Sequence, residues 1–552
     1  MDHFLSKKRL ELGPWQALER GIARLLEHGG FKDVKIVGGS GDLGADVVAV
    51  KGKKRWLVQS KYRRNVGAIS KKAVQEAFKA MQVYEADTCI TATNQYFSDD
   101  AKKYNSDKRK LGFDSRLWDK EQLFKFASDR EYKSLSYRDP RPYQNEAIKA
   151  IKKEINNGRK RGLLTLATGL GKTLISSTII AEFLEDNPSA NILVLAHMRD
   201  LVKQLDLASW SQFDKNITTH IWTDNEKPTF MNGVLFATWQ SIFNALKKGD
   251  IFPKQFDLII VDECHHAASE NYSYLLGELK ASFLLGVTAT PWRSDKNSLR
   301  PLFGEPLFSM SVVEGMAKGY LAEVDYEMLV DDINWDEISF LSEKGYSIRD
   351  LNQRLYLPER DSSMVEEIVS VISKTTHPRV LVFCRSIRHA EKLLSYFRSF
   401  DIVTSILHSN LSRTERFKAL TNFRTGKIAV LISIEMLNEG IDVPEVNIVC
   451  FARVTHSRRI FLQQLGRGLR ITNDKNKVKV LDFVADIRRV AEGIDMNSEA
   501  SKLREEENLF YKNSQIIKFS SEVKPFFKQY LSDMADISNL DENSRLEYPT
   551  EI

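Results

Sequence analysis

The chain has 552 residues, of which 42% are hydrophobic and 28% charged, and its formal net charge at pH 7 is +6. This composition predicts a globular protein of three or four domains and excludes a disordered or fibrous chain. The mild basic excess is compatible with a polyanionic partner but does not identify one.

The sequence also favours a cytoplasmic protein. No apolar run reaches the roughly 18 residues that a membrane-spanning helix needs, and residues 1–12 are charged and lack an apolar signal core. The four cysteines lie far apart, without the Cys-x-x-Cys pair of a zinc or redox site. We therefore expect a reducing compartment and no contact with a membrane.

The N-terminal part begins with a predicted helix over residues 15–31. Its apolar stripe has helical spacing, Glu19 lies on a neighbouring face, and Gly29-Gly30 ends it. The stripe consists of Leu18, Ile22, Leu25 and Leu26.

A predicted hairpin follows, formed by residues 44–50 and 55–61. In the second run Gln59 and Lys61 are two positions apart and therefore share a face, and antiparallel pairing can bring Asp46 beside them. An acid, a side-chain carbonyl and a lysine placed together can hold Mg²⁺ and position a water against a phosphodiester.

This arrangement resembles the Mrr-like branch of the restriction endonucleases, whose Asp…(Asp/Glu/Gln)-x-Lys signature reads here Asp46…Gln59-x-Lys61, with Glu19 matching the family's helix glutamate. The resemblance covers roughly residues 12–126 and implies a metal-dependent DNA endonuclease, with Asp46 and Gln59 as metal ligands. Gln59 in place of an acid removes one negative ligand.

Basic residues gather around the predicted nuclease site and on a later segment. The first cluster, next to a candidate phosphodiester site, is interpreted as a phosphate-binding surface. The later cluster is equally well explained as a solvated face. The first comprises Lys51, Lys53, Lys54, Arg55, Lys61, Arg63, Arg64, Lys71 and Lys72, and the second Lys102, Lys103, Lys108, Arg109 and Lys110.

A second chemistry is indicated by two apolar runs of strand length, residues 163–173 and 258–266, each of which delivers polar residues to its carboxyl end. In the first, glycines allow backbone N–H groups to approach phosphate oxygens, a lysine adds positive charge, and a helix begins at a threonine. These residues are Thr168, Gly169, Gly171, Lys172 and Thr173. In the second, Asp262 is placed to hold Mg²⁺, together with Thr173, and Glu263 to deprotonate the attacking water of ATP hydrolysis.

Residues 138–490 resemble the superfamily-two helicases and translocases of the DEAD/DEAH group. Leu166 stands where the stricter phosphate-loop pattern has glycine, so the match is to the looser helicase form. The resemblance implies that Gln144 reads adenine and that Asp442 binds the nucleotide. The matching segments are 141–144, 194–204, 236–241, 288–291, 382–385, 433–444 and 463–470.

Arg467 and Arg470 lie in the last of these segments, on a separate lobe from Lys172. We interpret them as arginine fingers, which requires the two lobes to close on ATP and thereby links hydrolysis to motion.

The predicted fold class is α/β, and the predicted domains follow the chain in order. They are an N-terminal restriction-endonuclease-like domain (1–130), a linker (131–140), a first RecA-like lobe (141–320), a connector (321–363), a second RecA-like lobe (364–490) and a helical C-terminal tail (491–552).

The sequence therefore predicts an ATP-dependent DNA translocase or helicase joined to an endonuclease, of the kind used in restriction and anti-phage defence, with ATP and Mg²⁺ as cofactors. No methyltransferase or target-recognition segment is visible, so we expect specificity to come from a partner protein or from modified bases. Two alternatives remain open at this stage: a DNA-repair helicase whose N-terminal domain only binds DNA, and an RNA-remodelling ATPase.

The finger interpretation predicts that Arg467→Ala binds ATP about as tightly as the wild type but hydrolyses it roughly 10³-fold more slowly, because a finger acts mainly on the transition state. Nucleotide titration and steady-state hydrolysis would be measured on the same preparation. A loss confined to affinity would assign the arginine a structural role.

Overall fold

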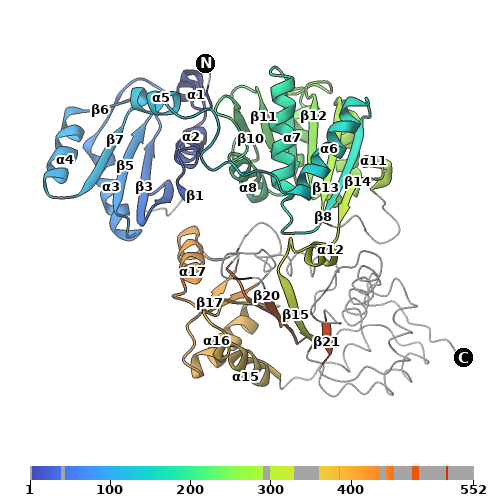
Figure 1. Cartoon of the computed structure of the whole chain (residues 1–552). Helices are drawn as coiled ribbons and strands as arrows, with labels where there is room; N and C mark the ends of the chain where they lie inside the picture. Colours follow the sequence, from blue (N-terminus) through green and yellow to red (C-terminus); the bar gives the residue numbers. More distant parts are fainter. Residues whose placement is uncertain are drawn as a thin grey trace, which may run out of the picture. The chain divides into compact units, whose positions relative to one another are not determined.

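A computed structural model describes residues 3–38, 44–289, 299–328, 360–384, 386–408, 410–434, 443, 445–452, 475, 477–483 and 517–519 (Figure 1). The chain divides into two compact units. The first contains residues 1–164, 171–288 and 298–308, and the second contains residues 165–170, 289–297 and 309–552. Both are α/β structures, as predicted.

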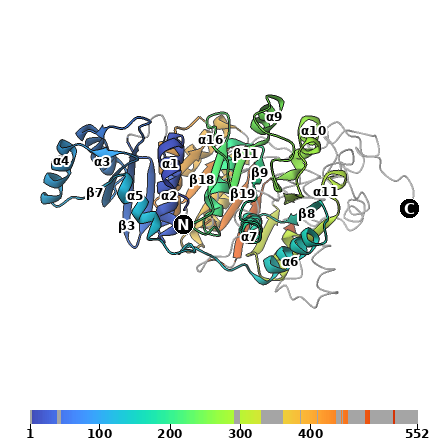
Figure 2. The ribbon, with the colours of Figure 1, turned by 90° about the horizontal axis from the view of Figure 1, so that it is seen from above.

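The N-terminal domain is a five-stranded sheet in the order β1-β2-β3-β5-β7, antiparallel across β1, β2 and β3 and parallel from β3 to β7. Figures 1 and 2 show α2 and α5 on one face and α3 and α4 on the other, and each pair packs on its own apolar cluster. The elements are α1 (Lys7–Leu12), α2 (Trp15–His28), β1 (Lys32–Ile36), β2 (Val47–Lys51), β3 (Lys54–Lys61), β4 (Ala68–Ile69), α3 (Lys71–Val83), β5 (Thr88–Thr93), β6 (Tyr96–Phe97), α4 (Asp99–Lys110), β7 (Asp114–Trp118) and α5 (Lys120–Ser128).

The two local predictions for this domain are confirmed. Helix α2 ends at His28 with Gly29 as its cap, and the hairpin pairs β2 with β3 so that Val47 lies opposite Val58. Gly52, in the turn, has a φ of 63°, a left-handed conformation that glycine adopts without strain.

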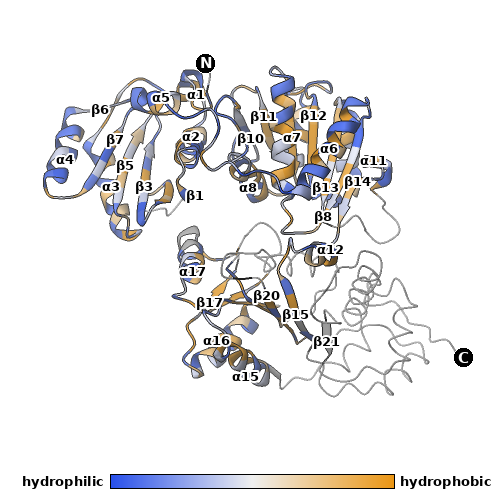
Figure 3. Ribbon diagram, in the orientation of Figure 1, coloured by the Kyte–Doolittle hydropathy of each residue, from blue (hydrophilic) through white to orange (hydrophobic). Residues whose placement is uncertain are grey.

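The first predicted RecA-like lobe contains a seven-stranded sheet in the order β10-β11-β9-β12-β13-β8-β14. Its central strands are fully buried apolar runs, seen as orange arrows in Figure 3, which is the pattern of a parallel sheet covered on both faces. The elements are α6 (Pro142–Asn156), β8 (Arg161–Leu166), α7 (Lys172–Asp186), β9 (Ile192–Ala196), α8 (Arg199–Ser209), β10 (Thr219–Trp222), β11 (Val234–Thr238), α9 (Trp239–Lys247), β12 (Leu258–Asp262), the 3₁₀ helix η1 (Cys264–Ala268), α10 (Glu270–Glu278), β13 (Phe283–Thr288), α11 (Arg300–Phe303) and β14 (Pro306–Met310).

The second lobe contains another seven-stranded sheet, in the order β17-β18-β16-β19-β20-β15-β21, and the pairings described are parallel. Its elements are α12 (Val312–Ala317), β15 (Glu323–Met328), α15 (Arg360–Ser373), β16 (Val380–Phe383), α16 (Ile387–Ser399), β17 (Thr404–Leu407), α17 (Arg413–Thr425), β18 (Val430–Ser433), β19 (Ile448–Phe451), β20 (Lys477–Asp482) and β21 (Ile517–Phe519).

Two short segments differ from the prediction. Residues 323–328, assigned to the connector, form strand β15, and residues 517–519, assigned to a helical tail, form strand β21 beside it. Strand β15 pairs with β20 on one side and with β21 on the other. These pairings with distant backbone set the conformation of both segments, and the local sequence does not predict them. The rest of the predicted tail lies outside the described residues.

The four cysteines are all free and buried. Burial raises the pKa of the Cys89 thiol to about 11, as expected for packing residues that are not reactive. Among the helices that the structure describes, none is both long and apolar enough to cross a membrane.

Asn94 provides a stability test for the N-terminal domain. It is 1% exposed. Its Oδ1 accepts a hydrogen bond from the Arg63 N–H at 2.8 Å, and its Nδ2 donates to the carbonyl groups of Arg63 (2.8 Å) and Leu10 (3.0 Å). Asn94→Ala strands these buried groups and should lower the free energy of unfolding by about 2–4 kcal/mol. Denaturant unfolding checks this, with the exposed Asn65→Ala as control; equal stability of the two variants would contradict it.

Candidate nuclease and nucleotide sites

The hairpin and α2 bring together the residues predicted for the nuclease site. Asp46 precedes β2 and continues its pairing, because its N–H donates to the Val58 carbonyl at 2.9 Å. Its Oδ2 accepts hydrogen bonds from Gln59 Nε2 (2.9 Å) and from the Ser60 N–H (2.5 Å). Asp46 and Gln59 are 5% and 4% exposed. The structure thus places Asp46 beside Gln59 in a nearly dry environment.

Glu19 reaches the same place from α2. A Cβ atom on Gly38 would lie 3.0 Å from Asp46 Oδ1 and 3.1 Å from Glu19 Oε2, so the two carboxylates converge on this glycine. A larger side chain at position 38 would occupy the space between them. The spacing of Asp46, Gln59 and Lys61 predicted the hairpin contacts, whereas only the resemblance pointed to Glu19.

Lys61 faces a residue that the sequence analysis missed. Its Nζ lies 2.7 Å from Glu76 Oε2 on α3, and both side chains are about one third exposed. Glu76 belongs to no motif, and no signal in the sequence singled it out from the other charges of an amphipathic helix. The first basic cluster therefore includes a lysine that already has an acidic neighbour.

The donors at this site fit a divalent metal ion. Gln59 Oε1 is buried and has no hydrogen-bond partner among the described residues, and Glu19 and Asp46 supply the carboxylates. Two carboxylates and an amide carbonyl are oxygen donors of the kind that Mg²⁺ accepts while keeping several waters. Within the described parts of the chain no group of three or more His, Cys, Asp or Glu residues is arranged to hold a metal ion.

The nucleotide site lies between the ends of β8 and β12. Gly169 and Gly171 have φ values of 92° and 85°, which shape the phosphate loop in a conformation that other residues rarely adopt. Lys172, at the start of α7, places its Nζ 3.2 Å from Glu263 Oε1, and these side chains are only 11% and 13% exposed. The predicted lysine and the predicted base are therefore in contact.

Glu263 is held by several constraints. It follows β12 with a φ of 45°, a strained conformation for a residue with a side chain. His265 Nδ1 lies 3.3 Å from Glu263 Oε2 and 3.1 Å from the Thr288 hydroxyl. Sequence reasoning missed His265, although it lies two residues after the predicted base.

The two neighbouring acids titrate in opposite directions. Burial, followed by the Glu263 charge, raises the pKa of Asp262 to about 7. Burial also opposes ionisation of Glu263, but the charge of Lys172 and the hydrogen bond with His265 outweigh it, and the pKa of Glu263 falls well below its usual value. Glu263 is therefore the more readily ionised member of the pair.

Gln144 lies against the phosphate loop. Its Oε1 accepts a hydrogen bond from the Arg141 N–H at 2.8 Å, and a Cβ on Gly171 would lie 2.4 Å from its Nε2.

The Thr173 carbonyl accepts a hydrogen bond from Ser177 Oγ at 2.6 Å, and the hydroxyl of Thr168 is buried without a partner among the described residues. The predicted residues Asp442, Arg467 and Arg470 lie outside the described residues.

Three protein-family models match the chain in succession. "Restriction endonuclease" matches residues 11–127, "Type III restriction enzyme, res subunit" matches residues 138–293, and "Helicase conserved C-terminal domain" matches residues 362–472.

Individual relatives agree with these matches. The putative ATP-dependent helicase IRC3 of Saccharomyces cerevisiae is 26% identical over 62% of this chain and 51% of its own. The type I restriction enzyme EcoAI endonuclease subunit of Escherichia coli is 26% identical over 67% of this chain and 50% of its own. This chain thus spans about half the length of these relatives. The solved structure of the ATP-dependent type ISP restriction-modification enzyme LlaBIII bound to DNA has the same fold over 95% of this chain and 42% of its own, with a TM-score of 0.56 and 17% identity.

The contact between Lys172 and Glu263 generates a test. Lys172→Ala or Glu263→Gln should abolish ATP turnover without unfolding the protein, because each removes charge that acts on the reacting phosphates or water, an effect of several kcal/mol. Hydrolysis and circular dichroism would be measured together. If both variants kept more than about a tenth of wild-type turnover, the assignment would be wrong.

Proposed function

This chain joins an Mrr-type restriction-endonuclease domain to a superfamily-two helicase motor, and from this premise we propose that it hydrolyses ATP to translocate on or remodel DNA and cuts DNA with its N-terminal domain. The observation that carries the nuclease half of this proposal is that Asp46, which is buried, meets Glu19 at Gly38 through Oδ1 and accepts a hydrogen bond from Gln59 through Oδ2, while Lys61 lies two residues after Gln59 on β3.

The ion pair between Lys172 and Glu263 supports the proposed ATP hydrolysis. In the structure the two charges lie 3.2 Å apart and neutralise each other. ATP phosphates bound in the loop formed by Gly169 and Gly171 would compete with Glu263 for the Lys172 ammonium group. The Glu263 carboxylate would then be available to accept a proton from the attacking water. Thr173 and Asp262 would hold the Mg²⁺ that neutralises phosphate charge.

Phosphodiester cleavage uses a similar division of labour. Asp46, Glu19 and Gln59 would hold a divalent cation, which supplies an activated water and neutralises phosphate charge when bound. Lys61 presents a positive charge toward the scissile phosphate, and Glu76, at 2.7 Å, restricts where that ammonium group lies. The neighbouring lysines and arginines hold the DNA backbone without reading its sequence.

The biological setting we propose is restriction or anti-phage defence in the cytoplasm, with Mg²⁺ as the metal. Its support is the similarity to the EcoAI endonuclease subunit and the match to the type III restriction subunit model. A protein partner, or a preference for modified bases, would then supply target choice.

The decisive experiment separates the two activities. Asp46→Ala and Lys61→Ala should lower DNA cleavage by a factor on the order of 10² or more and leave DNA-stimulated ATP hydrolysis unchanged, because neither residue contacts the nucleotide site. Cleavage of unmodified and base-modified duplexes would be measured with and without ATP, with hydrolysis recorded in the same tubes.

Equal cleavage by wild type and Asp46→Ala would show that the nuclease site lies elsewhere. If the wild type cut no substrate, the N-terminal domain would be assigned to DNA binding only. Stimulation of hydrolysis by RNA and not by DNA would move the motor to RNA remodelling.

A further inference from the structure

Helix α2 faces two sites at once. Glu19 points to Gly38 and Asp46 in the nuclease site, whereas the next residue, Arg20, and Arg24 one turn later contact the first motor lobe. Residues four apart lie on one face of a helix, so α2 presents one face to the nuclease site and another to the motor. All of its residues except Trp15, Gln16 and Glu27 are buried.

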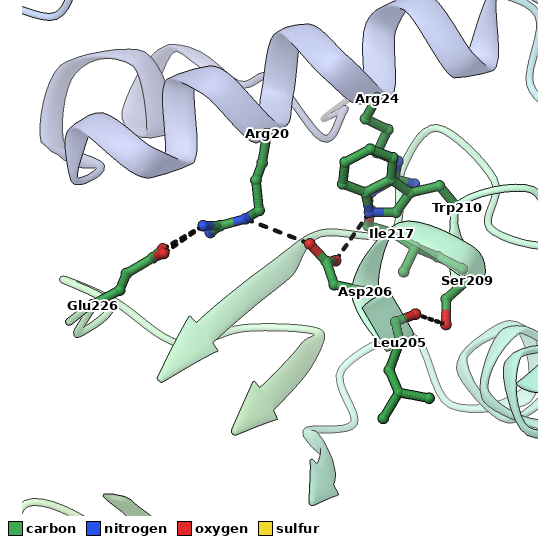
Figure 4. Close-up of polar contacts among 8 residues, drawn as sticks. All are labelled: Arg20, Arg24, Leu205, Asp206, Ser209, Trp210, Ile217 and Glu226. Atoms are coloured by element: carbon green, nitrogen blue, oxygen red, sulfur yellow. Dashed lines mark hydrogen bonds and ion pairs between the residues drawn. The ribbon is translucent and has the colours of Figure 1, made fainter. Parts of the chain in front are cut away.

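Arg20 forms a dry ion cluster with two acids of the motor lobe (Figure 4). Its Nη1 donates to both carboxylate oxygens of Glu226, at 2.5 and 2.6 Å, and its Nε lies 3.4 Å from Asp206 Oδ2. The three side chains are 7%, 4% and 0% exposed. Asp206 lies on α8, and Glu226 follows β10.

Arg24 extends the same contact. It donates to the carbonyl groups of Ile217 (2.6 Å) and Asp214 (3.0 Å) in the motor lobe. Its guanidinium lies 4.4 Å from the ring centroid of Phe4, which belongs to the N-terminal domain, and 6.0 Å from that of Phe213, which belongs to the motor lobe. At 2% exposure it is as dry as a core residue.

The apolar core and the linker also join the two domains. Trp210 of the motor lobe packs within the core cluster of the N-terminal domain, and its indole N–H donates to Asp206 Oδ1 at 2.9 Å. The Phe4 N–H donates to the Lys215 carbonyl at 2.7 Å, and the Lys215 N–H donates to the carbonyl of Tyr132 in the linker at 2.9 Å. The linker is therefore bonded to the motor lobe and does not act as a tether.

The charges make this interface specific to one arrangement. Buried arginines lie close together at this interface. Burial and the nearby charge of Arg20 lower the pKa of Arg9, on α1, to about 9. Burial lowers the pKa of Arg24 to about 10. Burial also disfavours the charge on Arg20, but Glu226 and Asp206, with a smaller contribution from Glu19, outweigh it and raise its pKa. A displaced register would leave a dry guanidinium without its carboxylates, which is strongly unfavourable.

The same helix that supplies Asp206 is linked to the nucleotide site. Ser177 Oγ donates to the Thr173 carbonyl at 2.6 Å and contacts the hydroxyl of Ser209 at 2.8 Å. Ser209 is three residues after Asp206 on α8, and Thr173 lies in the first turn of α7, directly after the phosphate loop. A continuous set of contacts therefore runs from the nucleotide site through α7 and α8 to α2.

We infer that the nuclease domain is docked on the first motor lobe in one fixed arrangement. Arg20 is the positioning residue on which this docking depends. Through the docking, α2 couples ATP hydrolysis by the motor to DNA cleavage at the nuclease site. The coupling part rests on the proposed function, whereas the docking part does not.

Limited proteolysis of the full chain tests the docking. Arg20→Met should release an N-terminal fragment by cleavage within residues 129–141 at least about tenfold faster than the wild type, since the buried acids then lose their partner. Arg116→Met is the matched control, because Arg116 pairs with Asp114 on the exposed surface of the same domain, and it should behave as the wild type. Adding Glu226→Gln to Arg20→Met should cause little further release, since the two changes remove one contact.

Arg20→Lys keeps the charge but has a single nitrogen, which cannot face Glu226 and Asp206 as Nη1 and Nε do, and should give intermediate release. It serves if Arg20→Met fails to fold. Release no faster than that of Arg116→Met from either Arg20 variant would overturn the docking.

Cuts made per ATP hydrolysed test the coupling. The Arg20 variant should keep hydrolysis within about twofold of wild type and lose at least about tenfold in cuts per ATP, because Lys172 and Glu263 make no direct contact with Arg20, whereas Glu19 of the nuclease site lies next to it on α2. An unchanged ratio in a variant that releases its nuclease fragment would overturn the coupling. If the wild type hydrolysed ATP but cut no DNA, the proposed nuclease function and the coupling would fall, and fragment release would still decide the docking.

Discussion

Helix α2, buried between the nuclease sheet and the first motor lobe, holds the nuclease site against the motor. One face of this helix supplies Glu19 to the nuclease site, and the other supplies Arg20 and Arg24 to lobe 1. Because a helix is rigid over this length, contacts that hold Arg20 and Arg24 in place on the motor also set the position of Glu19. The dry ion cluster of Arg20 with Asp206 and Glu226 is costly to form and even more costly to break on one side. It therefore selects one orientation of the nuclease domain on the motor.

Both sites balance charges that would repel one another. Asp262 and Glu263 are adjacent and buried, and the Lys172 ammonium keeps Glu263 ionised while the pKa of Asp262 rises. Asp46 and Glu19 converge on Gly38, and Gln59, in place of a third carboxylate, donates a hydrogen bond to the other oxygen of Asp46. Three carboxylates in this dry space would repel one another without a cation. The glutamine keeps an oxygen donor at the site and lowers that repulsion.

The strained and special backbone positions gather at these sites. Glu263 has a positive φ, and Gly169, Gly171 and Gly44 also have positive φ values beside the proposed catalytic groups. At Gly44, a Cβ would lie 2.8 Å from Gln59 Oε1. Such positions persist because the surrounding sheet over-determines them, and they pre-organise groups that must not rearrange during reaction.

Sequence patterns alone predicted the parallel α/β lobes, the β2–β3 hairpin and the positions of Gln59 and Lys61 on a strand and of Lys172 after a tight turn. These features depend on short-range patterns: buried runs of strand length, two-residue alternation that places Gln59 and Lys61 on one face, and glycines at fixed offsets from Lys172. Only the tertiary structure decided which charges face one another across separate elements. Glu76 beside Lys61 and Arg20 between Asp206 and Glu226 carry no local signature, because a charged residue on a helix is expected to be solvated until the surface that buries it is known. The strands Glu323–Met328 and Ile517–Phe519 were missed for the same reason, since pairing with distant backbone, and not local propensity, made them strands.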